Sequence, residues 1–446
     1  MTSRHTFRAA APRAAALAAA ALAAAACSRD PILLGTTPPT TAPFMSRYVA
    51  IGNSITAGYQ SGGINDSTQR RSYAHLLSLA SGATTYSYAK FAGVGCPPPI
   101  VNFLTGVRVS GDTSSTRCDF RDPMSTSAAL NNVAVPGANS WDAVGLGLTP
   151  TTTSPASLTT GGYSALTTFI LGGQTQLQRA VQLDPTFATI WIGNNDVLAG
   201  ALASAGDSTK ATNLQNFRSN YATLVNGLRS GSPHLKGGVL IGVVDPTNVP
   251  LLIPIAVFSQ PVVNGAPNPA YYAVQALFGV GTRRPATFQI GFDPSCFVGT
   301  PLITFPALAG LAAAIPAAAP GYVFNCSNTA AQTPNLVTEA ERQFYANRVV
   351  AYNAYIQAKA DSIGWVFFDP NPIFVQLRQQ GAIPLFPNLA APTAPFATAL
   401  GRYITNDGVH PSTTSHYTLA NLLITAINTK YGSTIRALVP ADTVAP

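Results

Sequence analysis

Charged residues are scarce in this chain of 446 residues, where they make up only 9% against roughly 25% in an ordinary soluble domain. The net charge is +8, but the basic residues are scattered and form no run longer than the pairs Arg70-Arg71 and Arg283-Arg284. A nucleic-acid surface needs a clustered basic patch, so we expect no nucleic-acid partner. The abundance of Ala, Thr, Pro and Gly in place of charge favours an exported protein over a cytosolic one.

Several catalytic and binding motifs are also missing. No Gly-x-Ser-x-Gly occurs, so the chain lacks the nucleophile elbow of α/β-hydrolases. There is no His-Glu-x-x-His, no P-loop and no Gly-x-Gly-x-x-Gly after a predicted strand. Without Cys-x-x-Cys and with only five histidines, a metal site is not expected. We interpret His75, His234 and His416 as structural residues, and we expect neither a metal nor a cofactor.

Long apolar runs are absent as well. The N-terminal run Ala14–Ala26 is shorter than the roughly 20 residues of a membrane-spanning helix, and Pro306 and Pro316 interrupt the most apolar later stretch. The first run follows several arginines and ends in small residues before Cys27, which is the layout of a secretory signal. It resembles a bacterial lipoprotein signal, which implies lipidation of Cys27 and an anchor on a bacterial membrane. A plain signal peptide and a secreted protein are the alternative.

The remaining four cysteines are even in number. Outside the reducing cytosol such a set predicts two disulfides, here Cys96–Cys118 and Cys296–Cys326, each closing a loop inside a Pro/Gly-rich insertion. Four buried free thiols are the alternative.

The composition divides the chain into four segments. We expect a signal peptide at 1–26, a Thr/Pro-rich tether at 27–46, one catalytic domain at 47–434 and a C-terminal tail at 435–446. A long apolar insertion lies within the domain at about 247–334. We interpret it as a structural insertion with its own small core, with a lid or a wall for an acyl chain as the alternative.

Short apolar segments alternate with helical patterns in the catalytic domain. The predicted strands are rich in β-branched and aromatic residues and lie in "YVAIGNS", "NNVAVPGAN", "FATIWIGNND", "GVLIGVVDP" and "WVFFDPN". Such near-continuous apolar runs are typical of parallel strands buried on both faces. The clearest helix begins at Thr338, has Glu341 at the capping-box spacing and ends near Gly364. The alternation predicts a three-layer α/β/α fold.

Small and polar residues stand where the predicted strands end. Gly52-Asn53-Ser54 follows the first strand, Gly137 the second and Asn195 the third. Near the C-terminus, Asp407 and His410 are three residues apart in "NDGVHPS". Because ligands of open α/β sheets bind at the carboxyl ends of the strands, we expect these groups to converge on one edge.

Acyl transfer requires this set of groups. A serine hydroxyl is a weak nucleophile until a base takes its proton, and histidine is suited to that role because its pKa lies near working pH. A carboxylate then orients the histidine. We therefore predict Ser54 as the nucleophile, His410 as the base and Asp407 as the orienting acid. The backbone amides of Ser54 and Gly137 and the side chain of Asn195 are the predicted donors to the oxyanion.

These four blocks resemble those of the SGNH, or GDSL-type, hydrolases. "GNSI", "NVAVPGA", "GNND" and "DGVHP" look like the family's first, second, third and last blocks, in the right order. The resemblance implies a flavodoxin-like fold with about five parallel strands and long loop insertions, and it implies the same site residues. The chain has Asn53 where the name-giving motif has Asp, but that position is outside the triad.

The sequence thus predicts a serine esterase or lipase that cleaves a small-molecule ester or lipid through an acyl-serine intermediate, and we expect a monomer. The alternatives are an exported carbohydrate O-acetylesterase of the same fold and, from another class, an inactive surface-binding lipoprotein. Asp196 and Asp369 also end predicted strands at the same edge. We interpret them as caps of turns, with a place in the pocket as the alternative.

Overall fold

The computed structural model of the chain describes residues 42–83, 86–119, 129–145, 170–172, 174–203, 207–390 and 399–438. The predictions for the signal peptide, for Cys27 and for most of the tether lie outside the described residues. Within the described ranges, no helix combines the length and the apolar character that crossing a membrane demands.

A four-stranded parallel sheet forms the centre of the molecule. Its order is β1 (Tyr48–Gly52), β2 (Phe187–Trp191), β3 (Gly237–Ile241) and β11 (Val366–Phe368). All three neighbouring pairs are parallel. The carboxyl ends of the strands therefore share one edge of the sheet, as the site prediction requires.

The second predicted strand is present only as a short extension of this sheet. Residues 131–135 run beside β1, where Ala50 N donates to Asn131 O at 2.7 Å and Val133 N donates to Ala50 O at 3.0 Å. With β1 the segment forms one bridge, between Ala50 and Asn132, so the expectation of about five strands is corrected to four. Gly52 explains the short ladder, because its N donates to Gln176 Oε1 at 2.9 Å and so does not form the next hydrogen bond to residues 131–135. With this segment counted, the strand order is the flavodoxin-like 2-1-3-4-5.

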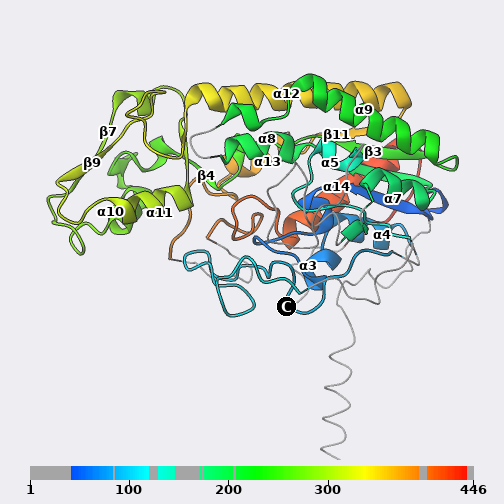
Figure 1. Cartoon of the computed structure of the whole chain (residues 1–446), viewed down its shortest axis with the longest axis horizontal. Helices are drawn as coiled ribbons and strands as arrows, with labels where there is room; N and C mark the ends of the chain where they lie inside the picture. The colour runs from blue at the N-terminus through cyan, green and yellow to red at the C-terminus, as the bar shows by residue number, and fades with distance from the viewer. Residues whose placement is uncertain are drawn as a thin grey trace, which may run out of the picture.

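Helices cover both faces of the sheet (Figure 1). Side chains of β1 alternate, so that Val49 and Ile51 belong to one buried cluster and Tyr48 and Ala50 to the other. The helices that contribute to the first cluster are α5 (Ser140–Val144), α7 (Gln176–Gln182), α8 (Asn194–Ala201), α9 (Leu214–Gly231) and α12 (Glu339–Ile363). Those of the second are α4 (Tyr73–Ala80) and α14 (Thr413–Tyr431). The predicted three-layer α/β/α architecture is confirmed.

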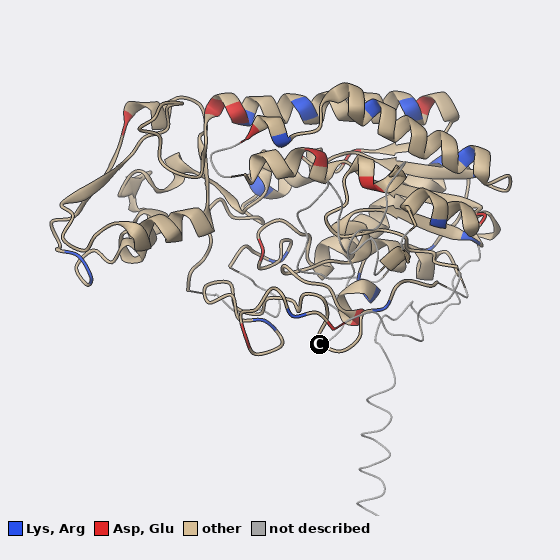
Figure 2. Cartoon of the chain, viewed as in Figure 1, with Lys and Arg blue, Asp and Glu red and all other residues tan. Residues whose placement is uncertain are grey.

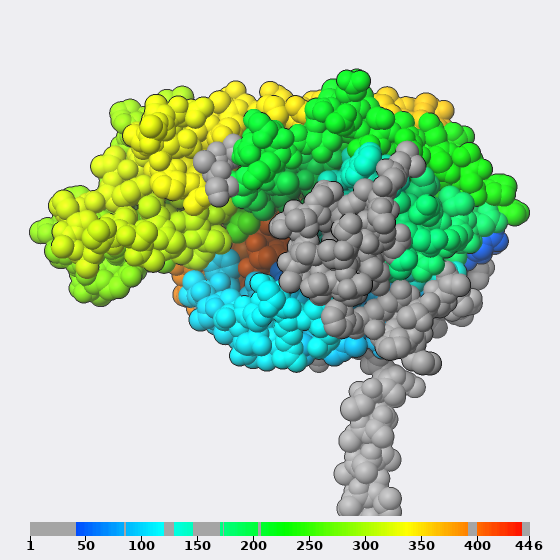
Figure 3. All heavy atoms as spheres, in the orientation of Figure 1, coloured from blue at the N-terminus to red at the C-terminus, as the bar shows by residue number. Residues whose placement is uncertain are grey.

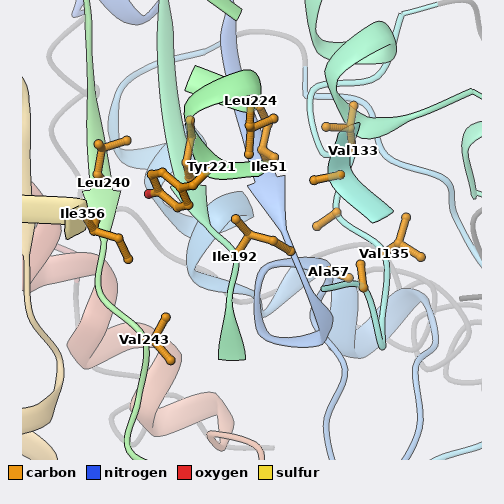
Figure 4. Close-up of a cluster of buried hydrophobic side chains, with 14 of the residues drawn as sticks. Ile51, Ala57, Val133, Val135, Ile192, Tyr221, Leu224, Leu240, Val243 and Ile356 are labelled. Atoms are coloured by element: carbon orange, nitrogen blue, oxygen red, sulfur yellow. The ribbon is translucent and has the colours of Figure 1, made fainter. Parts of the chain in front are cut away.

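The larger core lies between the sheet and helices α9 and α12. In Figure 4, Ile51 and Leu240 project from strands in the same cluster as Tyr221 and Leu224 of α9 and Ile356 of α12. All five side chains are almost completely buried, so this core fixes the strands whose ends carry the site.

Helix α12 begins and ends as predicted. Thr338 is its N-cap, and the Thr338 hydroxyl and the Glu341 carboxylate form the expected capping box. Gly364 ends the helix in the left-handed conformation, at φ 73°.

Residues 247–334 form an arm at one end of the molecule, at the left of Figures 1 and 3. Its elements surround a separate hydrophobic core, and the disulfide Cys296–Cys326 lies within it. These elements are β4 (Leu252–Pro254), β5 (Val262–Val263), β6 (Ala266–Pro267), α10 (Pro269–Phe278), β7 (Gln289–Phe292), β8 (Leu302–Thr304), α11 (Phe305–Ala314) and β9 (Gly321–Phe324). Strand β8 also pairs with β10 (Leu336–Val337), just beyond the arm. Charged side chains are sparse over the arm in Figure 2.

Both ends of the described chain pack on the second cluster. Ala42 and Met45 belong to it at the N-terminal end, and Ile435 and Leu438 at the C-terminal end. Leu438 N also donates to Asn421 Oδ1 of α14 at 2.7 Å.

Candidate active site

Ser54 stands at the first position of a short helix directly after β1. This helix, α2 (Ser54–Ala57), is capped by Asn53, whose Oδ1 accepts from Ile55 N at 3.1 Å. Gly52 is required here, because a Cβ atom at this position would lie 2.7 Å from Trp191 O of the neighbouring strand. The tight strand-to-helix turn therefore leaves Ser54 at the edge of the sheet, with 9% of its surface exposed.

The imidazole of His410 connects Ser54 to Asp407. His410 Nε2 lies 2.8 Å from Ser54 Oγ, and His410 Nδ1 lies 2.8 Å from Asp407 Oδ2. Each of these two contacts is a hydrogen bond. The structure thus brings together the three residues that the sequence predicted as a triad, in the order hydroxyl, imidazole and carboxylate.

Asp407 is held as an anion by a dense set of donors. Its carboxylate accepts from the backbone of Gly62 at 2.5 Å, of Val409 at 2.9 Å and of His410 at 2.9 Å. Burial alone would raise the pKa of Asp407, but the charge of His410 and these hydrogen bonds hold that pKa well below its usual range. The group is therefore a carboxylate at any ordinary pH and can orient the imidazole.

Tyr59 packs against the imidazole of His410 and was missed by the sequence analysis. Its ring centroid lies 4.8 Å from that of His410, and its backbone N donates to Ser54 O at 2.8 Å. Burial raises the pKa of its hydroxyl well above the usual value, so Tyr59 stays neutral and packs beside the imidazole ring. An aromatic residue soon after the serine was the only signal in the sequence.

The two predicted oxyanion donors outside Ser54 lie on adjoining loops. Gly137 is exposed and has φ 80°, a conformation that favours glycine. Asn195 lies in the first turn of α8, and its Nδ2 donates to Ala138 O at 2.8 Å. That bond uses one of the two amide hydrogens and leaves a second to donate. The Asn195 side chain is thereby fixed next to the loop that carries Gly137.

The two additional aspartates have different partners. Asp369 Oδ1 accepts from the backbone and side chain of Asn371, at 2.9 and 2.7 Å, and so caps a turn. Asp196 accepts from the backbone and the hydroxyl of Ser140, at 2.8 and 2.6 Å. Burial raises the pKa of Asp196 to about 6.

An apolar cavity of about 130 Å³ lies between α14 and the helix α13 (Asn371–Gln379). Ile55, Val409 and Pro411, which are direct chain neighbours of Ser54 and His410, contribute to its wall. The arm contributes only Val249. The other lining residues are Trp191, Asn194, Leu198, Val244, Pro246, Phe368, Pro370, Ile373, Phe374, Leu377, Ile383, Tyr403, Ile404, Ser415, Thr418, Leu419 and Leu422.

The disulfide Cys96–Cys118 is formed as predicted, and its loop supports the triad. Arg108 is 8% exposed and donates to Gly62 O at 2.8 Å. Because Gly62 N in turn donates to Asp407, the loop is linked to the carboxylate through one residue.

The other histidines have structural environments. His416 is fully buried, its Nδ1 accepts from Tyr73 N at 3.1 Å, and burial lowers its pKa to about 3. His75 packs edge-on against the rings of Tyr86 and Tyr88. His234 Nδ1 lies 2.5 Å from the Asp184 carboxylate. Nowhere among the described residues do three His, Cys, Asp or Glu side chains group as a metal site requires.

Comparison with known proteins adds the following. The family model described as GDSL-like lipase/acylhydrolase matches residues 48–272. An extracellular lipase from Streptomyces rimosus is similar in structure, with 13% identity, a TM-score of 0.34, and coverage of 85% of this chain and 98% of the lipase. A catalytic mutant of an acetylxylan esterase from Geobacillus stearothermophilus shows 12% identity, a TM-score of 0.31, and coverage of 90% and 99%. No curated protein matches the chain.

Proposed function

Because the chain belongs to the GDSL-like lipase/acylhydrolase family and is therefore a serine hydrolase acting on ester bonds, we propose that Ser54, His410 and Asp407 are its catalytic triad. The observation that carries the proposal is the pair of 2.8 Å hydrogen bonds that join the three side chains. The described site offers no competing hydroxyl with a histidine and a carboxylate in line.

In the first half of the reaction, His410 Nε2 takes the proton of Ser54 Oγ as the oxygen attacks the ester carbonyl carbon. The carbonyl π electrons move to the oxygen, and the resulting oxyanion accepts from Ser54 N, Gly137 N and Asn195 Nδ2. Each such donor is worth roughly 3–4 kcal/mol of transition-state stabilisation. Collapse of the intermediate breaks the bond to the alcohol oxygen, which leaves with the proton from His410.

Water completes the cycle. His410 takes a proton from the water as its oxygen attacks the acyl carbon, and the acid is released when Ser54 Oγ recovers the proton. Asp407 remains ionised throughout and stabilises the imidazolium that forms in both halves.

The apolar cavity supports an ester with an acyl chain longer than acetate. Its wall includes Ile55, Val409 and Pro411, the chain neighbours of Ser54 and His410, and is almost wholly aliphatic and aromatic. Burying a methylene is worth about 0.8 kcal/mol, so each carbon that enters the cavity adds to the binding of the substrate. The carbohydrate O-acetylesterase would leave this cavity without a use.

A panel of p-nitrophenyl esters from acetate to palmitate, assayed with the wild type and with Ser54→Ala, tests the function. We expect activity that rises beyond acetate in the wild type and is lost in the variant. A maximum at acetate would favour the deacetylase. Absence of activity on every ester would favour the binding lipoprotein.

Export is supported by the two disulfides, which fit an oxidising compartment. The finer proposal is that residues 1–26 are a signal peptide, that Cys27 carries the lipid, and that 27–46 tether the catalytic domain at 47–434 to a membrane. Cys27→Ser should move the enzyme from the membrane fraction to the soluble fraction without loss of esterase activity. An unchanged membrane fraction would contradict the anchor.

A further inference from the structure

The carboxylate of Asp196 joins the two loops that carry the proposed oxyanion donors. Its Oδ2 accepts from Ser140 N at 2.8 Å and its Oδ1 accepts from Ser140 Oγ at 2.6 Å. Asp196 directly follows Asn195 in α8, and Ser140 is the first residue of α5, three positions after Gly137. These bonds therefore run between the third and the second block at the point where both approach the site.

A second contact connects the same two loops. Asn195 Nδ2 donates to Ala138 O at 2.8 Å, so the position of the amide that would meet the oxyanion depends on the loop that holds Gly137. Asn220 of α9 adds support from behind, because its Nδ2 donates to Ser140 Oγ at 3.1 Å. The loop geometry is thus set by buried polar contacts and not by apolar packing alone.

Burying the carboxylate of Asp196 at this position costs folding free energy. Asp196 is 1% exposed, as is Ser140, and a buried carboxylate loses much solvation that its hydrogen bonds with Ser140 and the Thr212 side chain recover only in part. A carboxylate can accept both donors of Ser140 with separate oxygens, whereas an amide has only one acceptor oxygen.

We propose that Asp196 is a positioning residue, which acts through Ser140 to hold Gly137 N and Asn195 Nδ2 at the separation that the oxyanion requires. The proposal rests on the proposed function of the Ser54 site. Asp196 itself touches neither the substrate nor the triad in this account. Oxyanion donors act in the transition state and not in the ground state, so their displacement lowers kcat and leaves KM nearly unchanged.

The test compares Asp196→Asn and Ser140→Ala with the wild type on p-nitrophenyl acetate, which does not depend on the acyl cavity. We expect kcat to fall about 10- to 100-fold in Asp196→Asn and less in Ser140→Ala, with KM within about twofold. If Asp196 acts through Ser140, the double variant is no slower than Asp196→Asn alone. A raised KM at unchanged kcat, or fully additive losses, would overturn the proposal.

A second cycle separates positioning from general stability. In an Asn195→Ala background one donor is already missing, so Asp196→Asn should cost much less in kcat than it does in the wild type. Equal costs in both backgrounds would mean a merely structural role. If Asp196→Asn does not fold, Ser140→Ala combined with Asn195→Ala gives the same comparison with the loss of a single hydroxyl.

Glu339→Gln is the matched control. Glu339 also links distant segments, because its carboxylate accepts from Thr300 N at 2.8 Å, but it lies where α12 meets the arm. Its replacement should lower the melting temperature without changing kcat. Failure of the proposed function has a different result, because wild type and Ser54→Ala would then have equal activity. Failure of the Asp196 proposal leaves the wild type active and Ser54→Ala inactive.

Discussion

The imidazole of His410 lies 2.8 Å from the hydroxyl of Ser54, although 356 positions separate the two residues along the chain. The contact is possible because Ser54 follows β1 and His410 precedes α14. Helix α14 packs on the sheet face to which Tyr48 and Ala50 of β1 point. Leu251, at the start of the arm, adds a support, since its N donates to Gly408 O at 2.9 Å beside the histidine.

This contact predicts that the triad behaves as one unit. Ser54→Ala and His410→Ala should each lower kcat on p-nitrophenyl butyrate by about 10⁴-fold or more, because neither residue can form the acyl-enzyme without the other. Asp407→Asn should cost a similar factor of about 10⁴ by favouring the wrong tautomer of His410. The double variant Ser54→Ala/His410→Ala should be no slower than either single variant. Multiplying losses would contradict a shared mechanism.

The two disulfides should differ in their effect on activity. Replacing Cys96 and Cys118 with Ser frees the loop whose Arg108 bonds to Gly62 O, and Gly62 N holds Asp407. We expect this pair of substitutions to lower kcat on p-nitrophenyl acetate several-fold in addition to its effect on stability, by loosening the carboxylate.

Replacing Cys296 and Cys326 is the matched control. This disulfide closes a loop of similar length, with a sequence separation of 30 against 22, so each bond is worth about 3 kcal/mol in the chain-entropy estimate. It lies in the arm, which has its own core. The melting temperature should fall while kcat on acetate stays the same. Equal losses of kcat in both variants would contradict the link through Gly62.

The sequence was sufficient to predict that Ser54, His410 and Asp407 meet, and to predict most of the sheet, because both depend on local patterns. Apolar runs ending in Gly and Ser marked the strands, and Thr338 with Glu341 marked the start of α12 correctly. The fifth strand was overestimated, because Gly52 N, which would continue the ladder with residues 131–135, donates to the side chain of Gln176 instead. Nor did the pattern reveal that Asp196 meets Ser140 or that Tyr59 covers His410, since both contacts depend on how distant segments or helical turns meet in space.

The apolar cavity predicts a chain-length preference that a single substitution should change. Ile373 of α13 is half-buried in the cavity wall, so Ile373→Trp should fill part of the roughly 130 Å³. We expect kcat/KM for the octanoate ester to fall about 10- to 100-fold, the cost of excluding two or three methylenes, while the value for acetate stays within about twofold.

Val350→Trp provides the control for this experiment. Val350 is 67% exposed on α12, away from the cavity, so the same substitution there should leave the octanoate to acetate ratio unchanged. A ratio that is also unchanged in Ile373→Trp would mean that the acyl chain binds elsewhere.

The buried carboxylate of Asp196 predicts how stability depends on pH. Burial raises its pKa to about 6 in the folded state, against about 3.9 in the unfolded chain. The folded state therefore binds more protons than the unfolded state between pH 4 and 6, and stability falls as the pH rises through this window. Asp196→Asn has no such titration. In urea unfolding, the free energy of unfolding of the variant relative to that of the wild type should increase by roughly 1–3 kcal/mol from pH 4 to pH 7.

Asp407→Asn should show the opposite trend, because the pKa of Asp407 is lowered in the folded state. That carboxylate stabilises the fold above its unfolded pKa near 4, and its contribution is lost as the pH falls. The free energy of unfolding of the Asp407 variant, relative to that of the wild type, should thus decrease as the pH rises to about 4 and stay constant above it. If both variants ran parallel to the wild type from pH 3.5 to 7, neither carboxylate would have the environment that the structure gives it.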